Sequence, residues 1–309
     1  MKYRNEIFLK IVQNNKYIKN CDIILMKKLN FVLYKEEKIL NKIISDYHLH
    51  SEFSGDSTQN IEEIVKEGIR LGLEEIALTD HLEYDIEGMT DNWILDVDRY
   101  AKRVFELREK YKKDIDLKFG VEVGVQPHTK DYLESVIKKY PFDFVIASSH
   151  AIDRVDLAFG EIQAGKTKDE VQNLYFEYVL QNIEKYNEFN VYGHIDFVTR
   201  YGGEKFRGLD YKKHFDIIDV ILKKLIEKGK GIEVNTSGYR YREDRFYPCT
   251  DILKRYYELG GEILTIGSDS HIKDYMTMDF DRVYDFLESI GVKYISSFDK
   301  MQPSFKKIK

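Results

Sequence analysis

From residue 43 onward, short runs rich in β-branched and aromatic residues alternate with longer amphipathic stretches. The short runs are ISDYHLH, EIALTDH, LKFGVEVGV, DFVIASSH, NVYGHID, GIEVNT and EILTIGSDSH. The amphipathic stretches predict helices over about residues 60–72, 97–112, 129–139, 169–188, 211–229, 250–260 and 277–290. Strands that alternate with helices indicate a parallel sheet, and seven such units fit a closed barrel better than an open, doubly wound sheet. The pattern therefore predicts an α/β fold, a (β/α)7 barrel of parallel strands, with room for a final strand near residues 292–297.

Residues 1–42 differ from the rest of the chain. They hold short apolar clusters, separated by Lys and Asn, with no Gly, no Pro and no persistent period. This composition favours helix over strand. We expect an N-terminal extension over residues 1–42 that packs on the main domain or serves self-association. Residues 43–309 should form one domain, because no low-complexity linker or repeat divides them.

The balance of charges limits the partners. The chain has 48 Lys and Arg residues against 54 Asp and Glu, a formal net charge of −6, so it lacks the basic excess that follows nucleic-acid phosphates. Its two cysteines, Cys21 and Cys249, are too few for a disulfide framework, which fits a reducing cytoplasm. No apolar run approaches the length of a membrane span, and the N-terminus lacks a signal-peptide pattern. We expect a cytoplasmic protein with no nucleic-acid or membrane partner; a homo-oligomer is left open.

The segment DYHLHSEFSGD, residues 46–56, is the first one with metal-binding character. Asp46, His48 and His50 occupy every second position of a predicted strand, so their side chains share one face. Two imidazoles on one face can converge on a metal ion, and Asp56 adds a harder carboxylate ligand. For Asp46 we expect a hydrogen bond to one of the imidazoles. A single His-x-His also occurs by chance, so this segment alone does not establish a site.

Residue types that bind metals recur at the predicted C-terminal ends of most of the other strands. They are His81, Glu122, His150, His194, Asp269 and His271. In a parallel barrel all these strand ends open on one face, where loops assemble an active site. With His48 and His50, six histidines lie at predicted strand ends. Any one of them could be an ordinary hydrogen-bonded residue, but that interpretation fails for all six together. Nine candidate ligands exceed the needs of one ion, so the pattern predicts two or three divalent ions of zinc, iron or manganese.

The same segments, in the same order across about residues 44–300, resemble the polymerase and histidinol phosphatase (PHP) superfamily. YGHIDFVTRYG and IEVNTSGYR, with the Tyr247-Pro248 pair, resemble its histidinol-phosphatase branch. The resemblance implies a distorted seven-stranded barrel and a site for three ions that share Glu122 as a bridge. The implied ligand sets are His48, His50, Glu122 and Asp269; Glu122, His150 and His194; and Asp56, His81 and His271. The extension before residue 43 departs from the family pattern, in which the first motif lies near the start.

The activity implied by this resemblance is the hydrolysis of L-histidinol phosphate to L-histidinol and phosphate, a late step of histidine biosynthesis. A metal-bridging hydroxide would attack phosphorus, with Glu122, Asp269 and His271 as catalytic residues. Arg200 and Arg240 would bind the phosphate, since the guanidinium fork matches phosphate oxygens. The alternative for both is a surface arginine on a loop, and Arg154, Arg207 and Arg242 are weaker rivals.

Two other functions remain open at this point. Another PHP hydrolase, acting on a nucleotide, a nucleic-acid end or a phosphotyrosyl protein, would share every ligand. A non-catalytic metal-binding module would hold ions without turnover. The acidic balance disfavours the nucleic-acid substrate, and the two arginine-bearing segments favour a small phosphomonoester.

For several further polar and aromatic residues the sequence gives only a weak indication of their role. Around the sixth strand, Glu233, Asn235 and Ser237 would orient the arginines or the substrate amine, or Asn235 would shape the loop. Glu83 and Asp153 could meet a cationic group of the substrate, but solvated loop carboxylates are the expected reading. Trp93 and Tyr84 could form a wall of the substrate pocket, but we expect structural packing because aromatic residues are frequent in this chain (14%). For His128 we expect a place at the start of a helix without a chemical role.

Overall fold

The computed structural model describes residues 43–90 and 93–308, so the extension expected at residues 1–42 lies outside the described residues. Seven parallel strands form the main sheet in the order β1-β2-β4-β5-β8-β9-β10. They are β1 (Ser45–Leu49), β2 (Glu75–Leu78), β4 (Asp116–Gly124), β5 (Phe144–Ser148), β8 (Val191–Tyr192), β9 (Gly231–Asn235) and β10 (Leu264–Gly267). A short strand, β3 (His81–Leu82), extends the second unit and also pairs with β4. The strand order follows the chain order, as the predicted barrel requires.

The first and last strands approach each other and nearly close the sheet into a barrel. His50 N donates a hydrogen bond to Ser270 O (2.9 Å), and Ser270 N donates to His48 O (3.3 Å). On its other side β1 pairs with β2, and the register shifts between the pairs Asp46–Ile76 and Leu49–Leu78. Such irregularities bend a strand and redirect its side chains, and this one falls at the segment that carries His48. The predicted distorted (β/α)7 barrel is confirmed.

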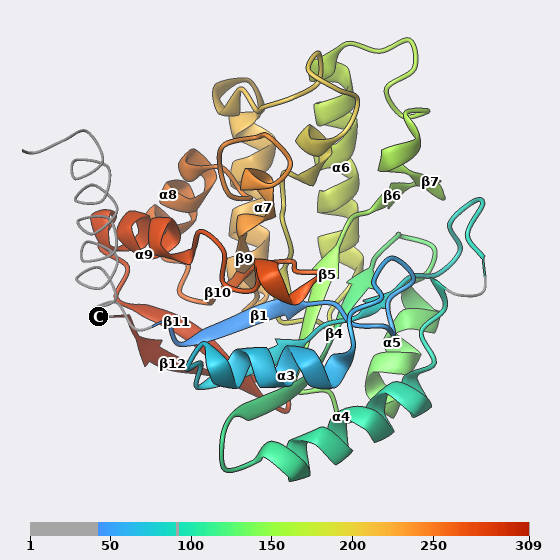
Figure 1. Ribbon diagram of the computed structural model, residues 1–309. Coiled ribbons are helices and arrows are strands. Elements are labelled where there is room, and N and C mark those ends of the chain that lie inside the picture. The colour runs from blue at the N-terminus through green and yellow to red at the C-terminus, as the bar shows by residue number, and fades with distance from the viewer. Residues whose placement is uncertain (1–42, 91–92, 309) are drawn as a thin grey trace, which may run out of the picture. The chain divides into compact units, whose positions relative to one another are not determined.

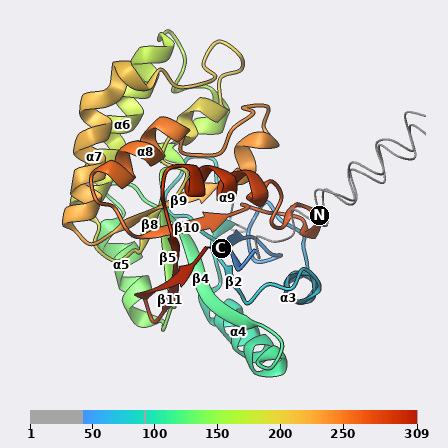
Figure 2. The ribbon, with the colours of Figure 1, turned by 90° about the vertical axis from the view of Figure 1, so that its left-hand side faces the viewer.

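One helix follows each barrel strand, and Figure 1 shows these helices on the outside of the sheet. They are α3 (Ile61–Arg70), α4 (Val97–Tyr111), α5 (Lys130–Lys139), α6 (Lys168–Lys185), α7 (Phe215–Glu227), α8 (Thr250–Glu258) and α9 (Phe280–Ser289). Their starts follow local sequence signals: the Asn60 side chain caps α3, and Thr167 with Glu170 forms a capping box on α6. The helix predicted from residue 211 opens with a 3-10 turn, η4 (Tyr211–His214), before α7. Figures 1 and 2 both show α6 and α7 side by side.

Apolar side chains pack on both the outer and the inner face of the barrel sheet. A large buried cluster lies between strands and helices, and a smaller one lies inside the barrel, made of Tyr47, Ala77, Phe144, Ile146, Val191 and Phe298. Phe298 comes from β11 (Tyr294–Asp299), which pairs antiparallel with β12 (Gln302–Lys307). Its ring lies 5.0 Å from the ring of Phe144, at the N-terminal end of β5. The last predicted strand therefore exists, but it belongs to a hairpin that covers the N-terminal end of the barrel.

The opposite end of the barrel carries the irregular segments. After β5 come β6 (Ala151–Ile152), β7 (Val155–Asp156) and the turn η2 (Leu157–Phe159). Further 3-10 turns follow β8, β9 and β10: η3 (Phe197–Arg200), η5 (Thr236–Tyr239) and η6 (Lys273–Tyr275). Within the described residues, no helix has the length and apolar character needed to cross a membrane.

Candidate metal centre

The nine candidate ligands meet at the C-terminal end of the barrel. A cavity of about 460 Å³ there is lined by seven of them: Asp56, His81, Glu122, His150, His194, Asp269 and His271. The other two, His48 and His50, are fully buried. Each comes from a strand or the turn after it, and the pairing of β3 with β4 sets His81 directly beside Glu122. The structure thus brings together all nine residues singled out from the sequence, from six different segments of the chain.

Glu122 lies at the centre of this group. Its Oε1 faces His194 Nε2 at 3.0 Å and His150 Nε2 at 3.3 Å. Its Oε2 faces His48 Nε2 at 3.2 Å and His50 Nε2 at 3.6 Å, and His81 Nδ1 at 2.9 Å. The two oxygens of one carboxylate therefore turn toward two different sets of imidazoles, as a ligand shared between two ions would.

Four sets of three residues have ligand atoms close enough to share one ion, all within 4.8 Å of one another. They are His50, His81 and His271; His48, Glu122 and His194; His48, His50 and Asp269; and His81, Glu122 and His150. At the mouth of the cavity, Asp56 Oδ2 lies 3.0 Å from His271 Nε2 and 3.6 Å from His81 Nε2. These sets overlap with the three implied by the resemblance but also cross them. His50 groups with His81 and His271, His48 with His194, and His81 with Glu122 and His150.

Unpaired buried atoms show that a cation fits this centre. His48 Nε2, His50 Nε2 and Glu122 Oε2 are buried and have no hydrogen-bond partner. A bare imidazole nitrogen that faces a carboxylate oxygen is repelled by it unless a proton or a cation lies between them. Imidazole nitrogens and carboxylate oxygens are the ligands preferred by zinc, iron and manganese. The residues present therefore suit divalent ions.

Opposing effects set the protonation of the centre. Burial lowers the pKa of His48, but Glu233, Glu122 and Asp269 outweigh it and raise the pKa well above its usual value. Burial would raise the pKa of Glu122, but His48, His150 and His81 hold it well below the usual range. The carboxylates thus stay ionised, and a cation that binds His48 must replace a proton there.

A further ring of polar groups supports the histidines from behind. Glu83, expected as a solvated loop carboxylate, is only 3% exposed and lies 2.5 Å from His150 Nδ1, so that expectation is wrong. Glu233 lies 2.5 Å from His48 Nδ1. Ser54 Oγ lies 3.1 Å from His50 Nδ1 and donates to Asp80 (2.7 Å). The sequence offered little signal for Glu83 or for Ser54 with Asp80, because their partners are set by the loops of the folded chain.

The two predicted substrate arginines differ in their surroundings. Arg200 lines the cavity, and its guanidinium carbon lies 4.2 Å from the ring centre of Phe197 and 4.1 Å from that of Tyr241. One of its nitrogens donates to Ser237, and its Nε is buried without a partner. Arg240 is not among the lining residues, and its Nη2 donates to the carbonyl oxygens of Ser268 (2.6 Å) and Asp269 (2.8 Å).

Three other sequence expectations can be compared with the structure. Asp46 was expected to bond to an imidazole, but it accepts instead from the backbone nitrogens of Ser268 (2.9 Å) and Thr277 (3.1 Å), so that expectation is wrong. Trp93 was expected only to pack structurally, but it lines the cavity. Asp156, which the sequence did not single out, lines it as well. His128 lies on the surface and contacts Asp85, outside the cavity.

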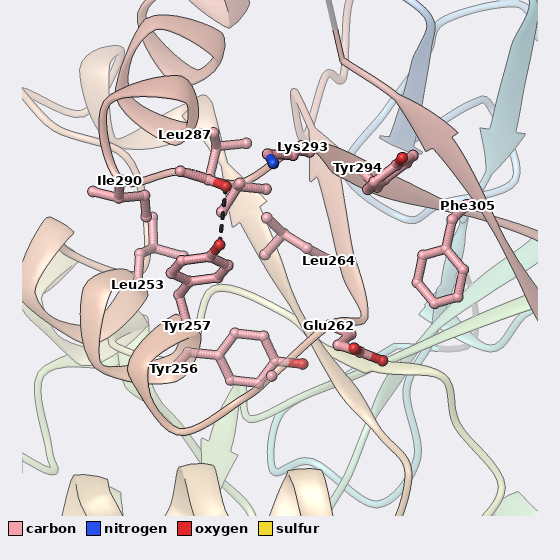
Figure 3. Close-up of a pocket in the computed structure, with 13 residues that line it drawn as sticks. Leu253, Tyr256, Tyr257, Glu262, Leu264, Leu287, Ile290, Lys293, Tyr294 and Phe305 are labelled. Carbon is pink, nitrogen blue, oxygen red and sulfur yellow. Dashed lines mark hydrogen bonds between the residues drawn. The ribbon is translucent and has the colours of Figure 1, made fainter.

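A second cavity, of about 490 Å³, lies elsewhere and has a different character (Figure 3). It opens between α8, α9 and the β11–β12 hairpin, and Leu264, Leu287 and Ile290 contribute to its apolar wall. Tyr257 Oη donates to Gly291 O (2.9 Å) across it. Glu262 and Lys293 are the charged residues among its described lining residues, so the chemistry belongs to the first cavity.

Comparisons with known proteins agree with this geometry. A family model described as PHP domain matches residues 46–237. The histidinol-phosphatase of Lactococcus lactis is 32% identical over 83% of this chain and 95% of its own length. A probable histidinol-phosphatase of Clostridium acetobutylicum is 33% identical over 81% of this chain and 95% of its own length.

A solved structure gives the same indication. The crystal structure of histidinol phosphate phosphatase from Lactococcus lactis, complexed with zinc, L-histidinol and phosphate, superposes with a TM-score of 0.79 at 32% identity. The match covers 84% of this chain and 98% of that one. A chain from Listeria monocytogenes, at 20% identity and a TM-score of 0.68, supports the fold alone.

Proposed function

The chain belongs to the PHP domain family, and we infer from this that it is a histidinol-phosphatase, which hydrolyses L-histidinol phosphate to L-histidinol and phosphate. The observation that carries this conclusion is the convergence of nine metal-type ligands at the C-terminal end of the barrel, where seven of them and Arg200 line one cavity. A cavity of about 460 Å³ suits a small phosphomonoester. The enzyme uses divalent metal ions; zinc is the ion named for the Lactococcus lactis structure.

We assign the ligands in three sets. His48, His50, Glu122 and Asp269 would hold one ion, Glu122 with His150 and His194 a second, and Asp56, His81 and His271 a third. The two oxygens of Glu122, each turned toward a different set of imidazoles, support its role as the bridge. Glu122, Asp269 and His271 are then the catalytic residues. Bound ions would supply an acidified water as nucleophile and positive charge for the phosphoryl oxygens.

Arg200 would bind the phosphoryl group of the substrate. Burial lowers its pKa, but Asp269 and nearby tyrosines outweigh this effect and raise the pKa, so the guanidinium is charged. Phe197 and Tyr241 flank its guanidinium and limit its movement, and Arg200 lines the cavity, where its guanidinium can donate to phosphate oxygens. Such a fixed, charged fork stabilises charge that develops on the transferring group. Phosphate binding by Arg240 stays a prediction. The cytoplasmic location and a possible homo-oligomer also stay predictions.

The test is phosphate release from L-histidinol phosphate, compared with a nucleoside monophosphate, phosphotyrosine and a simple aryl phosphate, with metal content measured on the same sample. We expect L-histidinol phosphate to be hydrolysed far faster than the other three. Equal rates on all four substrates would point to another phosphoesterase. Bound metal without any turnover would point to a binding module. Glu122→Gln, which keeps the side-chain shape but removes the charge, serves as the matched inactive variant.

A further inference from the structure

Two buried glutamates stand directly behind two of the proposed metal ligands. Glu83 follows β3 and is 3% exposed, with Oε1 2.5 Å from His150 Nδ1. Glu233 lies on β9 and is 1% exposed, with Oε1 2.5 Å from His48 Nδ1. Neither residue belongs to the ligand sets above.

These contacts determine which imidazole nitrogen is free. An ionised carboxylate only accepts hydrogen bonds, so Nδ1 of each histidine is the donor. In a neutral imidazole the other nitrogen, Nε2, then keeps its lone pair. His48 Nε2 lies 3.2 Å from Glu122 Oε2, and His150 Nε2 lies 3.3 Å from Glu122 Oε1. Both histidines therefore turn Nε2, the nitrogen that a metal ion would take over from a proton, toward the central carboxylate, one toward each of its two oxygens.

The surrounding chain is shaped to admit these glutamates. A Cβ atom on Gly124 would come within 1.7 Å of Glu83 Oε2, so only glycine fits on β4 beside this carboxylate. Glu233 is held by two further donors, since its Oε2 accepts from His194 N and Asn235 Nδ2, each at 3.1 Å. Both carboxylates thus have fixed positions before any substrate binds.

We propose that Glu83 and Glu233 are positioning residues that fix His150 and His48 in the tautomer with Nε2 directed at the metal site, and thereby strengthen metal binding. The proposal rests on the metal-dependent function inferred above. Carboxylates that accept the remote N–H of a histidine ligand orient the ring and make its other nitrogen more basic. The rival role concerns Glu83 alone, which borders the cavity and could instead contact a cationic group of the substrate.

The experiment measures metal binding directly. Apparent Zn²⁺ affinity is determined by chelator competition, and the visible absorption spectrum is recorded after loading with Co²⁺, for the full chain and for Glu83→Gln and Glu233→Gln. We expect both variants to bind Zn²⁺ about 10- to 100-fold more weakly and to show an altered Co²⁺ spectrum. Their kcat on L-histidinol phosphate should fall and recover in part at excess metal, with little change in KM.

Two control variants separate positioning from general effects. Glu75→Gln changes another buried carboxylate, 1% exposed, which is bonded to Ser297 rather than to a histidine, and should leave Zn²⁺ affinity unchanged. Asp156→Asn changes a carboxylate that lines the same cavity, and it should also leave Zn²⁺ affinity unchanged. Gly124→Ala should displace Glu83 and lower Zn²⁺ affinity as Glu83→Gln does, which gives a second route to the same result.

Unchanged Zn²⁺ affinity and an unchanged Co²⁺ spectrum in both glutamine variants would overturn the proposal. If Glu83→Gln instead raises KM and leaves metal binding intact, Glu83 contacts the substrate. Because the metal measurements need no substrate, they stand even if L-histidinol phosphate is not hydrolysed. A failure of the positioning role can therefore be told apart from a failure of the inferred function.

Discussion

Asp56 and His271, 215 positions apart in the sequence, meet at the mouth of the cavity with Oδ2 3.0 Å from Nε2. Their side chains are 36% and 27% exposed, whereas those of His48 and Glu122 are 0% and 1% exposed. Of the three proposed ligand sets, the one that contains Asp56 and His271 is therefore the nearest to solvent.

This difference in exposure predicts the order in which ions leave. A mild chelator should remove the ion of the Asp56 set first, since water and chelator reach its ligands most easily. Asp56→Asn removes one charged ligand and should lower the metal content of the purified protein without unfolding it. Metal analysis at stepwise chelator concentrations, with circular dichroism as the check on folding, measures both effects. Simultaneous loss of all ions in the wild-type protein would contradict the assignment.

Metal binding should release protons and weaken in acid. Burial lowers the pKa of His150, but Glu83 and Glu122 outweigh it and raise the pKa to about 10. An imidazole with a raised pKa holds its proton at neutral pH and must give it up to a metal, so affinity rises with pH and is lost as the pH falls. Calorimetric titration with Zn²⁺ in two buffers of different ionisation enthalpy measures the protons released. An identical heat in both buffers would argue against this protonation.

The two arginines should give different phenotypes. Arg200→Ala is expected to lower kcat/KM on L-histidinol phosphate by about 100-fold or more, because it removes a charged donor from the wall of the cavity. Arg200→Lys keeps the charge but loses the planar fork, so its kcat/KM should lie between those of the wild-type protein and Arg200→Ala. Arg240→Ala should weaken metal binding as well as phosphate binding, since Arg240 also holds the backbone of Asp269. Arg154→Ala, a surface change outside the cavity, is the control. Equal losses of kcat/KM from Arg200→Ala and Arg240→Ala, with metal retained, would show that both bind phosphate.

The β11–β12 hairpin should stabilise the barrel without taking part in catalysis. Phe298 is 1% exposed and packs inside the barrel against Phe144. Phe298→Ala is expected to lower the free energy of unfolding by about 3–5 kcal/mol, measured by urea denaturation, with KM unchanged. The matched control is Phe305→Ala in the same hairpin, where the side chain is 49% exposed and the cost should be about 1 kcal/mol or less. Similar costs at the two positions would contradict this role.

The alternation of strands and helices was enough to predict the barrel, because each strand–helix unit is encoded locally. The candidate ligands could be found for a related reason: parallel strands all end on one face, so residues at their ends must converge. The hairpin at the other end was not predicted, because the pairing of β11 with β12 leaves no period that distinguishes it from an eighth barrel strand.

Interactions that depend on exact loop geometry escaped the sequence. Glu83 lies 67 positions from His150, and only the fold brings them together; the one local hint was Gly124 within GVEVG. Asp46 shares a face with His48 but accepts backbone hydrogen bonds from residues more than 220 positions away. Neither distance nor direction of this kind can be read from spacing along the chain.

The junction between β1 and β10 also has a consequence for how the protein is made. Among the candidate metal ligands, His48 and His50 are the first to leave the ribosome. Ser270 follows β10 and joins it to β1, but it is translated more than two hundred codons later. Until then β1 has an open edge, and such edges invite pairing with other chains. A chain released before residue 269 would lack Asp269 and His271 as well as Ser270, which makes the closing strand contact. An incomplete product is therefore unable either to seal its barrel or to complete its ion-binding site.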